Sequence, residues 1–149
     1  MFIKISVLLV SNPTSAWTSL ADLLRPSMET IKNLHVELFV RDNDDDPLFH
    51  LPSELEVMRS KNVIESITIE VVVGGVGCKQ GNEWGRLDEL FTKTGWSALK
   101  KLSVAIRIYN CERQLPLDSE SALRKLPETQ FVRLSSSKTI SFAFEVRSH

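Results

Sequence analysis

The chain has 149 residues, of which 42% are apolar and 25% are charged, and its formal net charge at pH 7 is -1. This composition is ordinary for a single globular domain spanning residues 1–149, and the near-neutral charge excludes a general field that attracts nucleic acid or an anionic membrane. No apolar run reaches the length of a membrane span. Two cysteines, Cys78 and Cys111, are too few for a disulfide-built scaffold, so we expect a cytoplasmic or nuclear protein with free thiols.

The first expected element is a strand within residues 1–10. Its opening, FIKISVLLV, alternates apolar residues at Ile3, Ile5, Val7 and Leu9, which is typical of a strand with one buried face. The same segment contains a lysine and a short apolar run, with small residues soon after it, as a secretory signal peptide does. The run from Ile5 to Val10 contains Ser6 and is shorter than a signal peptide needs, so secretion is the less favoured interpretation.

Four later segments repeat one apolar pattern. They are IKNLHVELFV (31–40), IESITIEVVV (64–73), LKKLSVAIRI (99–108) and SKTISFAFEV (137–146). Three share the form apolar-x-x-apolar-x-apolar-x-apolar-x-apolar, and the fourth has Ser137 in the first place. The period of two in each tail predicts four strands that each bury one face. The predicted buried residues are Leu34, Val36, Leu38, Val40, Ile67, Ile69, Val71, Val73, Leu102, Val104, Ile106, Ile108, Ile140, Phe142, Phe144 and Val146.

The intervals between these strands are long enough for a helix and two loops, as parallel crossovers require. Apolar residues at helical spacing lie in each interval, next to proline or glycine residues that begin or end helices. The expected stripes are Ala16, Leu20, Leu23 and Leu24 before Pro26; Leu51, Leu55 and Met58, entered through Pro52 and Ser53; Trp84, Leu87, Leu90 and Phe91 before Gly95; and Ala122, Leu123 and Leu126 before Pro127. The sequence therefore predicts an α/β fold with the order β-α-β-α-β-α-β-α-β.

Two architectures fit this order: a doubly wound sheet with helices on both faces, and a solenoid of strand–helix units with helices on one side. A parallel sheet between two helix layers is apolar on both faces. Here the residues opposite the predicted buried set are mostly polar or small. They are His35, Glu37, Phe39, Thr68, Glu70, Val72, Ser103, Ala105, Arg107, Ser141, Ala143 and Glu145. We therefore expect a short solenoid of about five parallel strands, with the doubly wound sheet as the alternative.

The repeated block resembles a leucine-rich repeat of the strand-plus-helix kind. FTKTGWSALKKLSVAIRI (91–108) and ALRKLPETQFVRLSSSKTISFAFEV (122–146) are similar to the C-terminal region of leucine-rich-repeat-like, F-box-associated proteins of mushroom-forming fungi. The Asn or Cys that usually follows the L-x-L core is absent, and no F-box segment is recognisable before the repeats. The resemblance implies a repeat domain that binds another protein; it does not imply catalysis or a role as a ubiquitin-ligase adaptor.

The glycine-rich stretch EVVVGGVGCKQG (70–81) follows a predicted strand, as a nucleotide-binding loop does. A dinucleotide fingerprint needs G-x-G-x-x-G at the start of a helix, and a P-loop needs a Gly–Lys pair before Ser or Thr. After Gly75 and Gly77 the third glycine, Gly81, comes one place late, and Lys79 follows Cys78. We interpret the stretch as a loop between repeated units and predict no cofactor.

Other polar residues give no recognisable catalytic or metal motif. RDNDDDPLFH (41–50) alternates aspartates but lacks the glycine and glutamate of a calcium-binding EF-hand loop, so it reads as a solvated turn. The histidines His35, His50 and His149 are scattered over separate elements, and no spacing typical of zinc occurs. The tryptophans Trp17, Trp84 and Trp96 read as packing residues, and the basic residues are too sparse for nucleic acid.

We expect a non-enzymatic module that binds another protein through the open strand face, with no nucleic acid and no membrane as partner. The expected contact residues are His35, Glu37, Phe39, Thr68, Glu70, Val72, Arg107 and Tyr109. The alternative is a small α/β nucleotide-binding protein or enzyme that uses residues 74–81 and Lys79. The terminal strands could also pair with another copy or with a missing neighbouring segment, if the chain is a fragment of a longer array.

Overall fold

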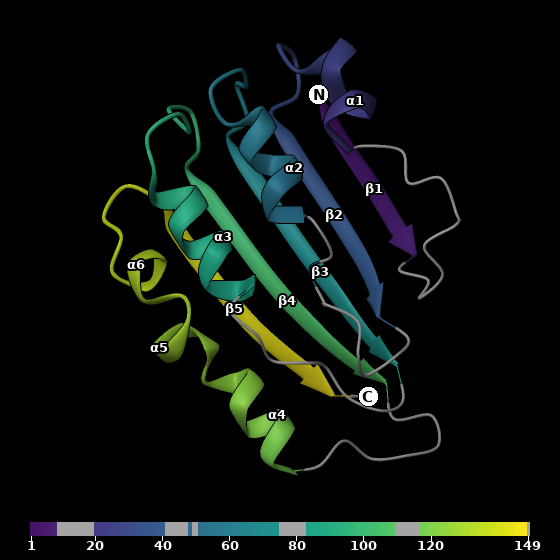
Figure 1. Ribbon diagram of the computed structural model, residues 1–149, viewed down its shortest axis with the longest axis vertical. Coiled ribbons are helices and arrows are strands. Elements are labelled where there is room, and N and C mark those ends of the chain that lie inside the picture. Colours follow the sequence, from purple (N-terminus) through teal and green to yellow (C-terminus); the bar gives the residue numbers. More distant parts are fainter. Residues whose placement is uncertain (9–19, 41–47, 49–50, 75–82, 110–116, 149) are drawn as a thin grey trace.

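The computed structural model describes residues 1–8, 20–40, 48, 51–74, 83–109 and 117–148 (Figure 1). The strands are β1 (Phe2–Leu8), β2 (Asn33–Val40), β3 (Ser66–Gly74), β4 (Lys101–Tyr109) and β5 (Ser141–Ser148). The helices are α1 (Leu20–Leu24), η1 (Arg25–Ser27), α2 (Leu51–Met58), α3 (Glu83–Thr92), α4 (Leu117–Arg124), α5 (Leu126–Thr129) and α6 (Val132–Ser135). None of the helices in these ranges is long and apolar enough to cross a membrane.

The described strands form one sheet in which every neighbouring pair is parallel and the order is β1-β2-β3-β4-β5. The predicted α/β class and the parallel sheet are therefore confirmed. A doubly wound sheet reverses its strand order at a switch point, and this order contains no reversal. Successive right-handed crossovers in one direction place their helices on the same face, and Figure 1 shows α2 and α3 in front of the sheet.

The described residues form one hydrophobic core on the helix-covered face of the sheet. This core contains residues from the helices α1, α2, α3, α4, α5 and α6. The strands β2, β3 and β4 each contribute every second residue. The predicted set in these three strands is buried as expected, except that the burial of Val40 lies outside the described part. In β5, Phe142, Phe144 and Val146 are only partly buried, because β5 is the last strand of the sheet.

The strand register is uniform from β1 to β4, and it corrects one predicted alignment. Leu34 pairs with Ile67, and Ile67 pairs with Leu102, as the sequence alignment expects. The alignment then places Ile140 opposite Leu102, but Leu102 pairs with Phe142. A shift of two residues keeps each side chain on its predicted face, so the alternation itself could not reveal the error.

The helical stripes agree with the structure in α2 and α3 and differ elsewhere. Leu23 is 55% exposed, because α1 buries the arc formed by Leu20, Ala21 and Leu24, and Leu23 lies outside that arc. α1 ends at Leu24 and α4 at Arg124, before Pro26 and Pro127 as expected. Each proline then lies at the start of a further helical turn, η1 or α5, where proline is tolerated.

Gly95 was expected to end the third helix, and it lies just beyond α3 with a φ of 111°. A Cβ at this position would lie 3.1 Å from the backbone oxygen of Arg59. The turn after α3 therefore requires glycine both for its backbone angle and for its close contact with the preceding repeat.

Candidate functional site

The eight predicted contact residues lie on β2, β3 and β4, on the face turned away from the core. Their neighbours along each strand are core residues, so the alternation places them on the opposite side of the sheet. In register, His35 lies beside Thr68, Glu37 beside Glu70, and Phe39 beside Val72. Arg107 continues the last of these rows on β4. We call this surface the open face.

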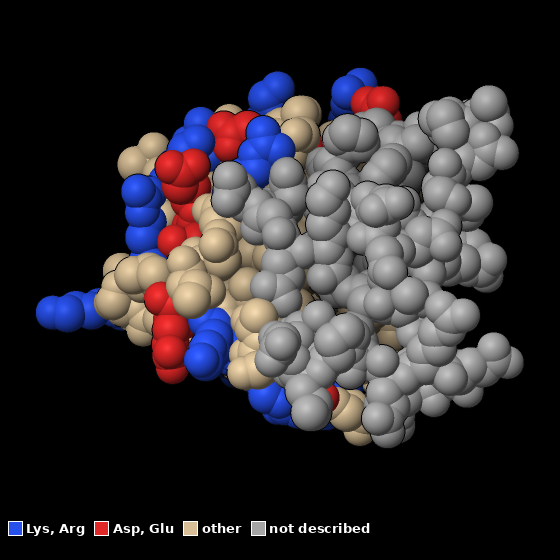
Figure 2. Space-filling model, turned by 60° about the horizontal axis from the view of Figure 1, so that its bottom comes forward, with Lys and Arg blue, Asp and Glu red and all other residues tan. Residues whose placement is uncertain are grey.

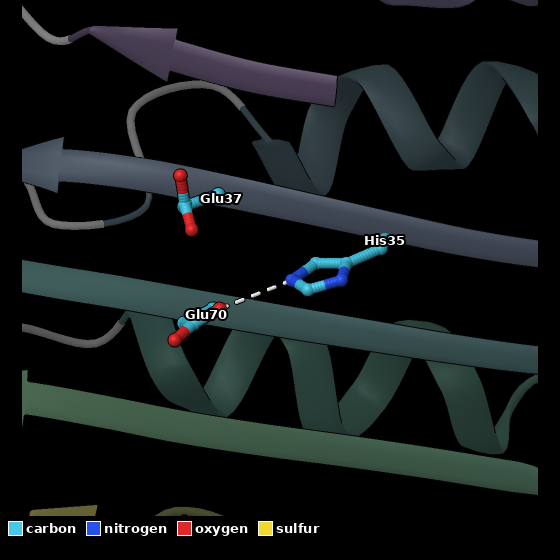
Figure 3. A group of neighbouring side chains, drawn as sticks. All are labelled: His35, Glu37 and Glu70. Atoms are coloured by element: carbon cyan, nitrogen blue, oxygen red, sulfur yellow. Dashed lines mark hydrogen bonds and ion pairs between the residues drawn. The ribbon is translucent and has the colours of Figure 1, made fainter. Parts of the chain in front are cut away.

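Charged side chains on the open face form a connected network across three strands. Nε2 of His35 lies 3.1 Å from Oε2 of Glu70, within hydrogen-bond distance (Figure 3). Nη2 of Arg107 donates to Oε2 of Glu37 at 3.2 Å, and Nε of Arg107 forms an ion pair with Oε1 of Glu70. Nη1 of Arg107 also lies 3.4 Å from the hydroxyl oxygen of Tyr109. The Arg107 guanidinium therefore contacts both glutamates and also Tyr109, the last residue of β4.

The register explains why a cation is needed between these glutamates. Glu37 and Glu70 are directly opposite each other on neighbouring strands, a placement that is destabilising for two like charges. Their side chains are only 10% and 16% exposed, so water screens the repulsion poorly. Arg107 comes from the next strand and one row further along, and its long side chain reaches back over both carboxylates.

Lys4 is a member of the network that sequence reasoning missed. Its Nζ lies 3.4 Å from Oε2 of Glu37, so β1 contributes a second cation to the same carboxylate. The signal was present: Lys4 stands between Ile3 and Ile5, and the predicted alternation already put it on the face opposite those apolar residues. The eight expected contact residues all lie on β2, β3 and β4, so they do not include Lys4 on β1.

Two predicted contact residues are less accessible than a contact surface requires. Glu37 and Val72 are each 8% exposed. The cations of Lys4 and Arg107 lie over the carboxylate of Glu37, and Val72 stands between Phe39 and Arg107 in one row of the sheet. Tyr109 is 36% exposed, and Phe39 is partly exposed. His35, Thr68, Glu70 and Arg107 are partly exposed as well, so Tyr109 is the most accessible of the eight. We call Phe39, Arg107 and Tyr109, which lie toward the carboxyl ends of their strands, the rim of the open face.

The structure also brings together three groups that no spacing in the sequence indicates as metal ligands. One ligand atom each from His35, Glu37 and Glu70 lie within 4.8 Å of one another. One imidazole and two carboxylates are a donor set that suits a divalent transition metal. However, Arg107 contacts both carboxylates and Lys4 contacts one of them, so these glutamates already have positive partners. The arrangement is an internally neutralised ion-pair network.

Several predicted features lie outside the described residues. These are residues 75–81 of the glycine-rich stretch with Lys79, the aspartates of the acidic turn, His50, His149, Trp17, Cys78 and Cys111. Figure 2 shows the end of the molecule at which the strands finish, and on its described part Lys and Arg side chains are interspersed with Asp and Glu. A surface that binds nucleic acid concentrates basic side chains in one patch. The described part of this end instead mixes basic and acidic side chains.

Comparisons of the chain with protein-family models, with curated proteins and with solved structures find no match. The open face is therefore interpreted from its own geometry.

Proposed function

We propose that the chain is a non-enzymatic interaction module, a short leucine-rich-repeat-like solenoid similar to the repeat region of F-box-associated proteins, that binds another protein through its open face. The observation that carries the proposal is the ion-pair network of Lys4, His35, Glu37, Glu70 and Arg107 on the face that the core leaves uncovered. Burying charged groups on a sheet face is costly, and this network offsets the cost with fixed pairing.

The network supports binding by holding the rim side chains in place. Arg107 is fixed by two glutamates, and Tyr109 lies beside it. Arginine and tyrosine are common anchors of protein interfaces, and a side chain that is already ordered loses less entropy when a partner arrives. We therefore assign direct contact to Phe39, Arg107 and Tyr109, and a supporting role to His35, Glu37 and Glu70.

The proposal also covers the type of partner and the location of the protein in the cell. The near-neutral charge favours a protein partner over nucleic acid or a membrane surface. The low number of cysteines favours the cytoplasm or the nucleus over a secreted location.

Photo-crosslinking from the open face tests the proposal. A benzophenone amino acid replaces Tyr109 in one protein and Val57 in a second, because Val57 is 61% exposed on α2 and lies outside the open face. Each protein is irradiated in extract of the source organism, and its crosslinked products are identified by mass spectrometry. We expect a partner that is captured from position 109 and absent from position 57.

A matched pair of variants then tests the contact surface. Phe39→Ala should weaken capture from position 109 by at least about tenfold, the effect of removing an interface anchor, whereas Val57→Ala should leave it unchanged. Arg107 is left in place in this test, because its loss leaves Glu37 and Glu70 facing each other. Equal capture from positions 109 and 57 would show that the open face is not the binding surface.

Self-association through the terminal strands is a separate prediction, because β1 and β5 form the two edges of the described sheet. Sedimentation velocity over a hundredfold concentration range measures it. Reversible growth in mass would support edge pairing, and a constant monomer mass would exclude it.

A further inference from the structure

A second polar region lies away from the open face, between the turn that follows α3 and the turn that precedes β5. Residues 91–100 form one wall of a cavity of about 730 Å³, and residues 133–140 contribute the other. Figure 1 shows these two turns at the end of the sheet where β4 and β5 begin. The volume lies in the range of about 300–1,000 Å³ that is usual for small-molecule sites. We call this cavity the turn pocket.

The lining of the turn pocket carries positive charge only. Its charged residues are Lys93, Lys100 and Arg133, and no carboxylate is among the residues that line it. Lys100 also approaches Glu65, which lies outside the lining, at 3.8 Å. The hydroxyl-bearing lining residues are Thr92, Thr94, Ser97, Ser136, Ser137 and Thr139. The hydroxyls of Thr92 and Ser136 already donate to backbone carbonyl oxygens, of Asp88 and Val132 respectively. The three cationic groups and the remaining hydroxyls are the chemistry that recognises an oxyanion.

Trp96 places an indole ring in the wall of the turn pocket. Trp96 lines the cavity and is 6% exposed, and its Nε1 is buried without a hydrogen-bond acceptor in the described structure. Its ring packs against Phe91, with 5.0 Å between the ring centroids. Nε1 of Trp84 is also buried and unpaired, away from this cavity, so the Trp96 N–H is a reporter of events at this wall and not in itself a sign of a ligand.

Both walls of the turn pocket are held by specific contacts. On the first wall, Nη1 of Arg59 donates to the carbonyl oxygen of Thr94 at 2.6 Å, next to Gly95 with its positive φ. On the second, the hydroxyl oxygen of Ser137 accepts hydrogen bonds from the backbone N–H groups of Thr139 and Ile140. A binding site keeps its geometry when its supporting residues are fixed in this way.

We propose that the turn pocket binds a phosphate monoester. A dianion matches a lining of three cations better than a single carboxylate does, and the pocket has room for the group that carries the phosphate. A nucleic-acid backbone would need a longer basic track than these three side chains provide. The proposal goes beyond the partner binding assigned to the open face and does not depend on it.

Nuclear magnetic resonance of the indole N–H groups tests the proposal directly. Protein labelled with ¹⁵N is titrated with inorganic phosphate, O-phosphoserine and adenosine monophosphate, with sodium chloride added to keep the ionic strength constant. Trp84 is the internal reference, because its Nε1 is also buried and unpaired but it does not line the turn pocket. The resonances are assigned with Trp84→Phe and Trp96→Phe variants.

We expect the Trp96 resonance to move and saturate with each phosphate compound while the Trp84 resonance stays in place. The double variant Lys93→Gln with Arg133→Gln should bind roughly tenfold more weakly, because it loses two charge-assisted contacts. Lys125→Gln is the matched control, since Lys125 is exposed and lines no part of this cavity. Tighter binding of O-phosphoserine would identify a phosphorylated protein side chain as the ligand, and tighter binding of adenosine monophosphate would identify a nucleotide.

An unmoved Trp96 resonance at millimolar phosphate would overturn the proposal. So would an equal response to chloride alone, which would show general counterion binding. The wild-type titration decides between these outcomes even if the double variant does not fold.

Discussion

Leu34, Ile67 and Leu102 lie side by side on the covered face of the sheet, while Glu37 and Glu70 lie side by side on the open face of the same strands. The apolar row needs only matching shapes and exclusion of water. The acidic row is tolerable only because Arg107 and Lys4 reach it from strands on either side. Stability on the covered face is therefore spread over many contacts, whereas on the open face it depends on a few charged atoms.

The two buried carboxylates among the described residues sharpen this difference. Glu37 on the open face is paired with the cations of Lys4 and Arg107. Asp88 in α3 is 5% exposed and accepts hydrogen bonds from the backbone N–H groups of Arg133 and Leu134, at 3.1 and 2.7 Å. It caps α6 from a neighbouring helix. Salt should weaken the first arrangement more than the second, because only the first depends on ion pairs, and their cations are partly exposed, Lys4 at 47% and Arg107 at 27%.

The largest effect is expected from the covered face. Phe131 is fully buried and packs against Trp84, Phe142 and Phe144. Phe131→Ala should lower the free energy of unfolding by about 3–5 kcal/mol, because it removes a large apolar side chain and leaves a cavity. Urea denaturation measures the change. Val132→Ala is the control, because Val132 is 54% exposed and its truncation should have little effect. Similar losses in both variants would mean that Phe131 is not a core residue.

The second effect concerns the cap of α6. Asp88→Ala should lower the free energy of unfolding by about 2–3 kcal/mol, because two backbone N–H groups lose a charged acceptor. The loss should be the same in 0.1 M and 1 M sodium chloride, as judged by urea denaturation. The exposed neighbour Glu89 provides the control variant Glu89→Ala. A loss that disappears in high salt would contradict the assigned role.

The third effect concerns the open-face network. Arg107→Ala should lower the free energy of unfolding by about 1–2 kcal/mol, since it leaves Glu37 and Glu70 opposed at a partly exposed site. Adding Glu70→Gln should restore part of this loss, because it removes one of the two like charges. Arg25→Ala is the control, because its ion pair with Asp22 is exposed. If the double variant were less stable than expected from the two single variants, repulsion between the glutamates would not be the cause.

The smallest effect concerns a partly exposed carboxylate, Glu120, that links α4 to β5. The Ser148 hydroxyl and the Arg124 guanidinium hold the pKa of Glu120 below its ordinary value of 4.5. A lowered folded-state pKa means that the stabilisation is present above pH 4.5 and is lost as the pH falls through the folded value. Glu120→Gln should therefore be slightly less stable than wild type at pH 7 and equal to it in strong acid. A difference that grew on acidification would have the wrong sign.

Alternation of apolar and polar side chains along the sequence is enough to predict much of the fold. It separated Ile67, Ile69 and Val71 from Thr68 and Glu70, and the structure buries the first set in the core. The spacing of the apolar stripes likewise located α2 and α3. These features follow from local geometry, since a strand has a period of two and a helix a period of 3.6.

Pairing between distant segments could not be predicted from such periods. The two-residue shift of β5 leaves the alternation unchanged, so only the three-dimensional register reveals it. The burial of Glu37 has the same origin, because its cations come from Lys4 and Arg107 on strands β1 and β4. The turn pocket depends on two turns that are about forty residues apart in the sequence.

The alternation of residues along each strand is enough to assign them to two faces, one apolar and one polar. The fold adds that Glu37 and Glu70 lie opposite each other, that Arg107 pairs with both, and that Trp96, Lys93 and Arg133 line one cavity. The physical reason is distance along the chain. Side-chain alternation is set by bonds within a strand, whereas charge pairing and cavity lining are set by which segments the folded core brings side by side.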